Sequence, residues 1–185
     1  GRELNFSSDI DVIYVYEHDD GLVGDLAPHP FFVKLFERVT ASLRDVTASG
    51  FVFRVDLDLR PEGRKGPLAN SVLGLERYYE TWGRTWERAA WIRARPVAGD
   101  LDLGHEVLSR LRPFVFRRRL DLDQVENLIQ MKARIDRESG LRRRGVDLKL
   151  GRGGIREAEF FVQAQQLLLG GREPRLRSNN TLEAL

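Results

Sequence analysis

The chain has 185 residues, which is enough to bury a core in one large domain or in two small ones. It carries 30 basic and 28 acidic residues and no cysteine, which excludes disulfides, zinc–thiolate sites and thiol nucleophiles. Charge therefore gives no indication of nucleic-acid binding, and no apolar run approaches the roughly 20 residues that span a bilayer. We expect a cytoplasmic protein with no membrane or nucleic-acid partner. Because it starts at Gly1 without an initiator methionine, we expect a piece of a longer protein.

The first half of the chain carries two strand patterns. Residues 9–16 are β-branched and aromatic apart from the acids, and residues 51–60 alternate between apolar and charged side chains, so both predict strands. Residues 18–30 predict a loop and residues 31–46 a helix, because apolar residues there recur at helical spacing. Glycine and proline in residues 61–67 predict a second loop.

The remainder predicts mostly helices. One helix is expected to carry a stripe formed by Val72, Leu75, Tyr79, Trp82 and Trp86, and helix-spaced aromatics of this kind favour a core role over base stacking. Residues 91–97 leave helix and strand open, and residues 98–104 predict a connector. Three further helices are expected at residues 105–111, 122–139 and 155–169. The fold class is therefore α+β over residues 1–100, followed by a helical domain over residues 101–185.

Acidic residues cluster on the two predicted strands. Asp9 and Asp11 are two positions apart, so their side chains leave the same face of a strand, with Cα atoms about 6.5–7 Å apart. Asp56 and Asp58 lie on the polar face of the second strand. Acids are depleted in strands, and converging carboxylates suit Mg²⁺, which prefers oxygen ligands and substrate phosphates. We therefore interpret the acids as a metal site, with Ser7 and Ser8 placed to meet phosphate oxygens.

Longer strings carry a family resemblance. The segment Gly1 to Asp11 resembles the signature of the polymerase beta-like nucleotidyltransferase superfamily, in the version of the glutamine synthetase adenylyltransferase family. That resemblance rests also on residues 51–61 (FVFRVDLDLRP), 66–68 (GPL), 83–88 (GRTWER), 111–118 (LRPFVFRR), 149–160 (KLGRGGIREAEF) and 170–174 (GGREP). It implies a small mixed sheet with flanking helices, here shortened at its N-terminus, followed by a helical domain that is shortened at its C-terminus.

The resemblance also implies an activity. Members of this family are multifunctional enzymes of nitrogen metabolism with two similar halves. One half uses ATP to add AMP to a tyrosine of glutamine synthetase, and the other removes it by phosphorolysis, which gives ADP. The strings at residues 54–56, 84–88 and 149–160 resemble the removing, N-terminal half. The PII signalling protein is implied as a regulator.

Site roles carried over from the family fall on three acids. Asp9 and Asp11 correspond to the first two metal ligands and Asp56 to the third carboxylate, for two Mg²⁺ ions, whereas Asp58 falls where family members need no acid. Asp56 is also expected to orient an attacking oxygen. Because two anions must meet, we expect cationic help from Arg60, Arg64 and Lys65 in the loop after the second strand. A solvated turn is an equal alternative for these three.

Other interpretations remain open. Glycines at residues 149–154 precede a helix, where a hinge or an anion site is possible. The half-reaction could be the adenylyl-adding one. A PII uridylyltransferase or a nucleic-acid polymerase shares the expected fold, although neither needs the long strings. A regulatory module without activity would be expected to lose Asp9, Asp11 or Asp56, and metal-dependent turnover would exclude a phosphate-binding interaction domain. The scattered histidines predict no site.

Overall fold

A computed structural model describes residues 8–119, 122–141, 148–149 and 153–185. These residues form two compact units, which we call the strand unit (residues 8–82 and 98–107) and the helical unit (residues 83–97 and 108–185). Residues 83–97 group with the later helices rather than with the strands. The two predicted domains, residues 1–100 and 101–185, stay a prediction. Among the described helices, none is long and apolar enough to cross a membrane.

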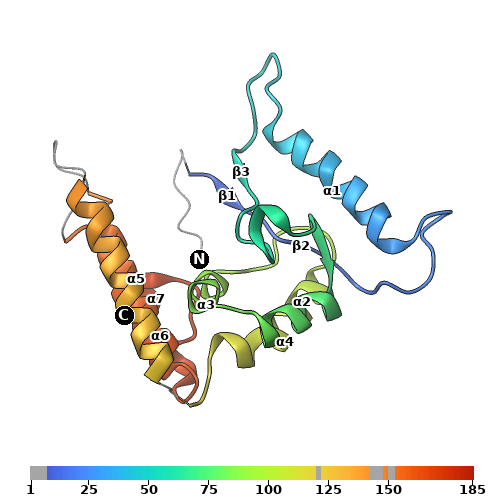
Figure 1. The fold of residues 1–185 in the computed structure, drawn as a ribbon. Helices are drawn as coiled ribbons and strands as arrows, with labels where there is room; N and C mark the ends of the chain where they lie inside the picture. Colours follow the sequence, from blue (N-terminus) through green and yellow to red (C-terminus); the bar gives the residue numbers. More distant parts are fainter. Residues whose placement is uncertain (1–7, 120–121, 142–147, 150–152) are drawn as a thin grey trace. The chain divides into compact units, whose positions relative to one another are not determined.

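Short parallel strand pairs form the centre of the strand unit. Strand β1 (Ile10–Asp11) pairs with β3 (Val55–Asp56), and Figure 1 shows the two side by side. Strand β2 (Tyr14–Tyr16) pairs with β4 (Ala69–Ser71). The unit also contains helix α1 (Pro28–Arg44), a 3₁₀ turn η1 (Gly63–Lys65), helix α2 (Val72–Thr81) and the start of α4 (Leu101–Val115). This mixture is compatible with the expected α+β class, and the polymerase beta-like arrangement stays a prediction.

Aromatic stacking joins α1 to β2. The buried Tyr14 ring stacks on Phe36 with centroids 4.3 Å apart, and the buried Tyr16 ring stacks on Phe32 at 4.9 Å. Each such pair contributes about 0.5–1.5 kcal/mol beyond the area it buries. Ala69 of β4 completes this core, with Leu57 among the side chains packed against it. Leu57 directly follows β3, so this core packs the end of β3 against β2 and β4.

Both predicted strands, residues 9–16 and 51–60, are longer than the strands that form. Residues 9–16 form β1 and β2 with a break at residues 12–13, and of residues 51–60 only β3 is a strand. Val52 and Phe53 instead donate their backbone N–H groups to the Leu43 carbonyl at the end of α1, at 3.2 and 2.9 Å. Phe51 is 52% exposed, so it does not belong to a buried apolar strand face.

The helix predicted through residues 72–86 is two helices. Helix α2 ends at Thr81, and α3 (Thr85–Ile92) starts anew because the Glu87 carboxylate accepts the Arg84 backbone N–H at 2.8 Å. The predicted aromatic stripe is therefore wrong beyond Tyr79: Tyr79 is buried, whereas Trp82 is 70% exposed. Residues 93–97 form neither helix nor strand.

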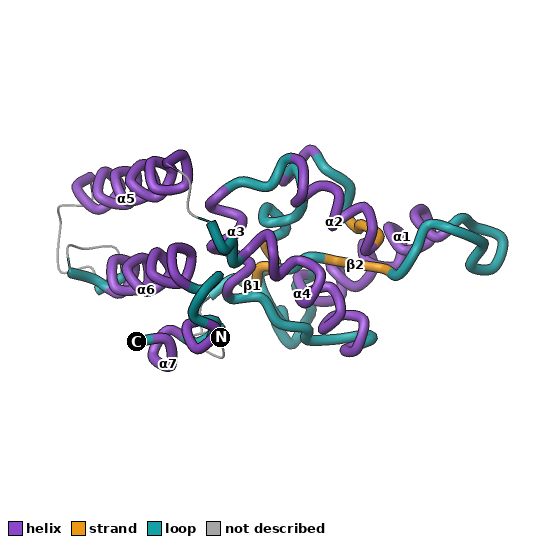
Figure 2. Tube along the Cα trace, turned by 90° about the horizontal axis from the view of Figure 1, so that it is seen from below, coloured by secondary structure: helices purple, strands orange, loops and turns teal. Residues whose placement is uncertain are grey.

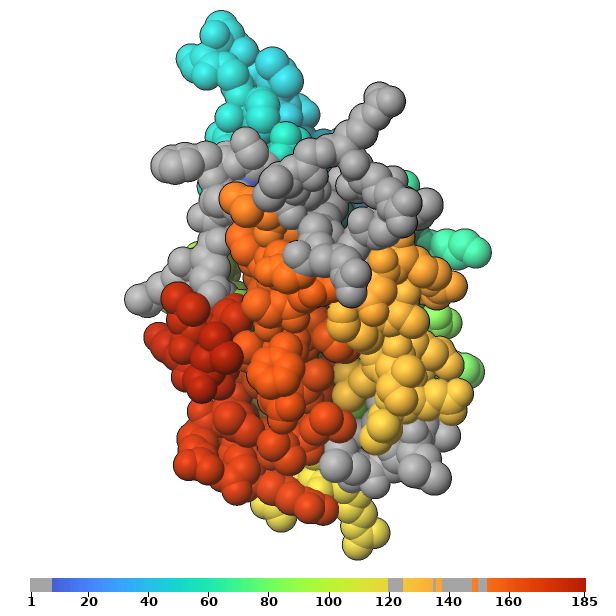
Figure 3. Space-filling model, turned by 90° about the vertical axis from the view of Figure 1, so that its left-hand side faces the viewer, coloured from blue at the N-terminus to red at the C-terminus, as the bar shows by residue number. Residues whose placement is uncertain are grey.

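Helices α5 and α6 dominate one face of the helical unit. Helix α5 (Leu122–Leu141) and α6 (Ile155–Leu169) run side by side, followed by the short η2 (Pro174–Leu176) and α7 (Thr181–Ala184) (Figures 2 and 3). The helix predicted over residues 155–169 is confirmed, and that at 122–139 extends to residue 141. The helix predicted at 105–111 lies within the longer α4, which takes in the end of the predicted connector.

Candidate functional site

Two of the predicted acids face each other across the β1–β3 pair. Asp11 and Asp56 are register partners, and the Ile10 and Val12 N–H groups bond the Arg54 and Asp56 carbonyls at 2.9 and 3.0 Å. In a parallel pair, residues opposite each other project to the same side of the sheet. The pairing of strands far apart in sequence thus places two carboxylates beside one another.

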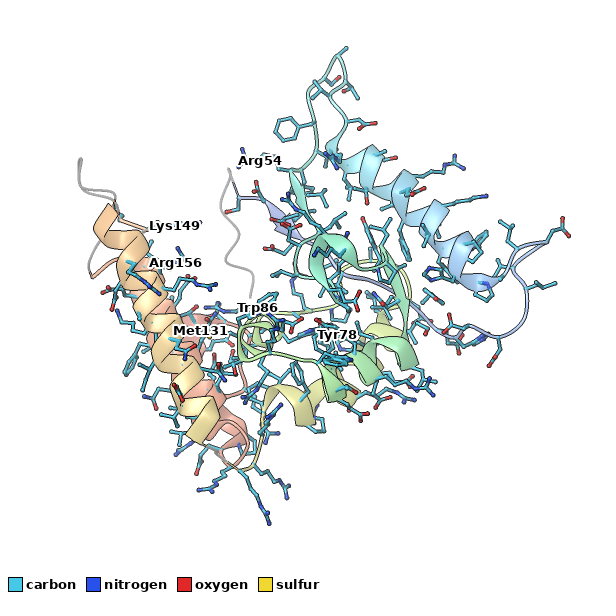
Figure 4. All side chains as sticks on the ribbon, viewed as in Figure 1. Arg54, Tyr78, Trp86, Met131, Lys149 and Arg156 are labelled. Atoms are coloured by element: carbon cyan, nitrogen blue, oxygen red, sulfur yellow. The ribbon has the colours of Figure 1, made fainter. Side chains whose placement is uncertain are left out.

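Asp9 lies next to this pair but has a cationic partner. It precedes Asp11 by two residues, and its carboxylate accepts a hydrogen bond from the Arg54 guanidinium, which comes from the residue before β3. Figure 4 labels Arg54 beside the start of β1. Both side chains of this ion pair are more than half exposed, at 58% for Arg54 and 52% for Asp9.

The carboxylates influence one another electrostatically. Loss of hydration raises the pKa of Asp11, and the nearby charges of Asp56 and Asp9 raise it further. Asp56 is oriented by its own backbone, because its Oδ1 accepts the Asp58 N–H at 2.7 Å. Crowded carboxylates of this kind attract a divalent cation, which would relieve their repulsion.

Asp58 and the predicted cations of the following loop bond largely within the loop. The Asp58 carboxylate accepts from Arg64 Nε at 2.9 and 3.0 Å, and this bond lowers the pKa of Asp58. Arg60 donates to the Leu57 carbonyl at 2.7 Å and to the Gly66 carbonyl at 3.4 Å, which closes the loop. Lys65 is exposed. The Asp58 carboxylate thus bonds Arg64 of the following loop, and its exclusion from the metal ligands stays a prediction.

The carboxylate oxygens of Asp9, Asp11 and Asp56 suit a hard cation, although the three groups do not converge on one point. Within the described residues, no three histidine or carboxylate groups are close enough to hold a metal ion together. Asp11 and Asp56 are register partners that offer oxygens on one face, while one oxygen of the neighbouring Asp9 bonds Arg54. Ser7 lies outside the described residues, and Ser8 is half-buried just before β1.

The glycine segment before α6 is only partly described, because residues 150–152 lie outside the described part. At its end, the Gly153 N–H donates to the Glu157 carboxylate at 2.9 Å, and Lys132 contacts the same carboxylate at 3.3 Å. Backbone N–H donation and Lys132 lower the pKa of Glu157. Because Glu157 of α6 already accepts the Gly153 N–H, that N–H is not open to an external anion, which favours the hinge interpretation over an anion site.

Sequence reasoning missed a polar network around Asp19. One Asp19 oxygen accepts from the Tyr16 hydroxyl at 2.5 Å and the other from the Ser71 hydroxyl at 2.6 Å, while His29 Nδ1 lies 3.0 Å from the Tyr16 hydroxyl. Ser71 also caps α2 by accepting the Gly74 N–H at 3.2 Å. These bonds lower the pKa of Asp19. A serine before an apolar helical run was the only available signal, and it indicates a cap rather than a network.

Comparison with known proteins gives two family matches. The model of the glutamate-ammonia ligase adenylyltransferase family matches residues 1–110, and the model of PII-uridylyltransferase matches residues 129–185. Similar curated relatives include bifunctional glutamine synthetase adenylyltransferase/adenylyl-removing enzymes. That of Thioalkalivibrio sulfidiphilus is 53% identical over 96% of this chain and 18% of its own length. Those of Xanthobacter autotrophicus and Rhodopseudomonas palustris are each 49% identical, over 100% and 99% of this chain and 19% of their own lengths. The chain thus spans about a fifth of the length of these relatives.

Proposed function

The chain belongs to the glutamate-ammonia ligase adenylyltransferase family, and we propose that it forms the catalytic core of the adenylyl-removing reaction. The observation that carries this proposal is the pairing of Asp11 with Asp56 on parallel strands, with Asp9 beside them. The protein substrate would be adenylylated glutamine synthetase, as the names of the relatives suggest, with the AMP on a tyrosine as the family resemblance implies. Inorganic phosphate would be the second substrate and ADP the product.

Asp9, Asp11 and Asp56 would hold Mg²⁺. When bound, the metal would supply positive charge to neutralise the phosphoryl oxygens in the transition state. The chain contributes the rigid part of the arrangement: β1 and β3 fix Asp11 opposite Asp56, and the Asp58 N–H fixes one oxygen of Asp56. We propose Asp56 as the group that orients the attacking oxygen. Strand pairing fixes its backbone, and the Asp58 N–H fixes one of its carboxylate oxygens.

The reaction is a phosphodiester exchange. An oxygen of inorganic phosphate forms a bond to the phosphorus of tyrosyl-AMP, and the bond from that phosphorus to the tyrosine oxygen breaks. The tyrosine oxygen takes up a proton, and ADP leaves. Both reactants are anions, so positive charge near the carboxylates favours their approach. Lys65 and Arg64 are exposed in the loop after β3 and would supply this charge, although Arg64 also bonds Asp58, whereas Arg60 donates to carbonyl groups of the loop backbone.

Two neighbouring functions compete with this proposal. The adenylyl-adding half would use a similar carboxylate arrangement to transfer AMP from ATP to the tyrosine, and the strings at residues 54–56, 84–88 and 149–160 favour removal by resemblance. PII uridylyltransferase matches only residues 129–185, whereas the adenylyltransferase relatives match almost the whole chain. We propose the PII protein as a regulator and the cytoplasm as the location, in keeping with a family that acts on glutamine synthetase.

The test is ADP release from adenylylated glutamine synthetase with phosphate and Mg²⁺. We expect phosphate-dependent ADP from the wild-type chain and its loss in the Asp9→Asn/Asp11→Asn variant. Asp25→Asn, which neutralises an exposed loop carboxylate, serves as the matched control and should retain turnover. Incorporation of AMP from ATP, with no ADP release from the modified enzyme, would assign the adding reaction instead. Equal ADP release by wild type and double variant would refute the carboxylate site.

A further inference from the structure

The face of the β1–β3 pair carries a four-residue array that the proposed chemistry does not explain. Opposite Asp11 stands Asp56, another acid, whereas Asp9 contacts Arg54, a base. Three carboxylates and one guanidinium therefore share one small face. Because the proposed metal needs Asp9 as a ligand, Arg54 and the metal require the same carboxylate.

We propose that Arg54 is a positioning residue that competes with the metal for Asp9. Without metal, the guanidinium bonds the Asp9 carboxylate and offsets its charge beside the Asp11–Asp56 pair. Metal binding takes over the Asp9 carboxylate and releases Arg54. This inference rests on the proposed metal site and adds that Arg54 lowers the affinity of that site for the metal.

The exposure of the ion pair makes the exchange feasible. Both partners are more than half exposed, and ion pairs of that kind are weak because water and salt screen them. A divalent cation facing three carboxylates gains more attraction than a single guanidinium facing one. Arg54 would thus lower metal affinity only modestly, while it prevents the empty site from carrying three unbalanced negative charges.

The first test measures Mn²⁺ affinity by the paramagnetic resonance signal of free Mn²⁺ at low salt. Arg54→Met should bind Mn²⁺ about two- to fivefold more tightly than wild type, the range expected when a weak exposed ion pair is removed. The matched control Arg38→Met removes the same charge from the exposed side of α1 and should change affinity little. In an Asp9→Asn background, the gain from Arg54→Met should shrink to that of the control.

The second test observes Arg54 itself. The Nε–H resonance of Arg54, identified by its disappearance in Arg54→Met, should move when Mg²⁺ is added to the wild-type chain. Asp9→Asn without metal should move it in the same direction, because both changes break the same ion pair.

Each outcome supports or overturns the proposed competition between Arg54 and the metal for Asp9. An equal affinity gain in both backgrounds would show a bulk charge effect and overturn the competition. An Arg54 resonance that stays fixed as Mg²⁺ binds would overturn it as well, even if Asp9→Asn abolishes measurable affinity. Absence of Mn²⁺ binding to the wild-type chain would instead remove the proposed metal site, and this inference with it. Binding with no effect of Arg54→Met would leave the metal site standing and remove only the role of Arg54.

Discussion

At the residue scale, the charged form of Asp11 is unfavourable where the strand pair places it. Loss of hydration and the Asp56 and Asp9 charges raise its pKa from the ordinary value of 3.8. The unfolded chain therefore ionises this group more readily than the folded one, and stability falls as pH rises through the folded pKa. We expect Asp11→Asn to be more stable than wild type at neutral pH and to lose that advantage near pH 3. Urea denaturation across this pH range measures the difference.

The same experiment contains its own check. Asp25→Asn removes a carboxylate from an exposed loop and should show no comparable gain. A lower stability of Asp11→Asn at neutral pH would contradict the electrostatic account. If the gain appears together with lost turnover, Asp11 is a group retained for activity at a cost in stability.

Asp19 should behave with the opposite sign. Its hydrogen bonds from Ser71 and Tyr16 lower its pKa below 3.8, so its contribution to stability is present above that value and is lost as pH falls through the folded pKa. Asp19→Asn should therefore be less stable than wild type at neutral pH, with the difference closing in acid. Thermal unfolding at pH 7 and pH 3 tests this, and a difference that persists unchanged at pH 3 would indicate that packing rather than charge is lost.

At the element scale, Arg88 joins three helices of the helical unit. It is 2% exposed, and its guanidinium donates to the Val115 carbonyl at 3.1 and 3.0 Å and to the Leu167 carbonyl at 3.4 Å. Both carbonyls lie in the last turns of their helices, where the helix dipole favours a cation. Arg88→Met leaves buried carbonyls without these donors, which should cost about 3 kcal/mol of unfolding free energy. Guanidinium denaturation measures it, with the exposed Arg134→Met as the control expected to remain near wild type.

Gly171 is required by a close approach of two backbones. A Cβ atom at this position would lie 2.1 Å from the Arg117 carbonyl oxygen, so the segment after α6 and the segment after α4 fit only without a side chain. Gly171→Ala should destabilise the helical unit by about 2 kcal/mol, in the range of overpacked substitutions. Gly24→Ala offers a comparison, because no atom lies within 4 Å of its Cβ and only its positive φ of 63° is penalised. A Gly171→Ala chain as stable as wild type would contradict this packing.

The sequence predicts helices better than strand pairing, for a physical reason. Helix α6 is determined by contacts three and four residues apart, so its periodicity gives its full extent. Residues 51–60 alternate like a long strand, yet the Leu43 carbonyl takes the Val52 and Phe53 N–H groups, and Asp56 takes that of Asp58. Such partners are distant or depend on a turn, and local alternation does not encode them. The shared face of the acids was predictable from spacing, whereas the Asp9–Arg54 pair was not.

At the scale of the whole molecule, the crowded carboxylates should link metal binding to global stability. A ligand that binds only the folded chain stabilises it in proportion to the logarithm of its concentration, by about 2.7 kcal/mol at a hundred times its dissociation constant. Mg²⁺ should therefore raise the urea midpoint of the wild-type chain, because it also removes the repulsion among Asp9, Asp11 and Asp56. The Asp9→Asn/Asp11→Asn variant should start more stable at neutral pH and gain little from Mg²⁺. Equal stabilisation of both chains would place the metal elsewhere, whereas stabilisation confined to the wild type would tie the cost of these charges to the binding of a cation.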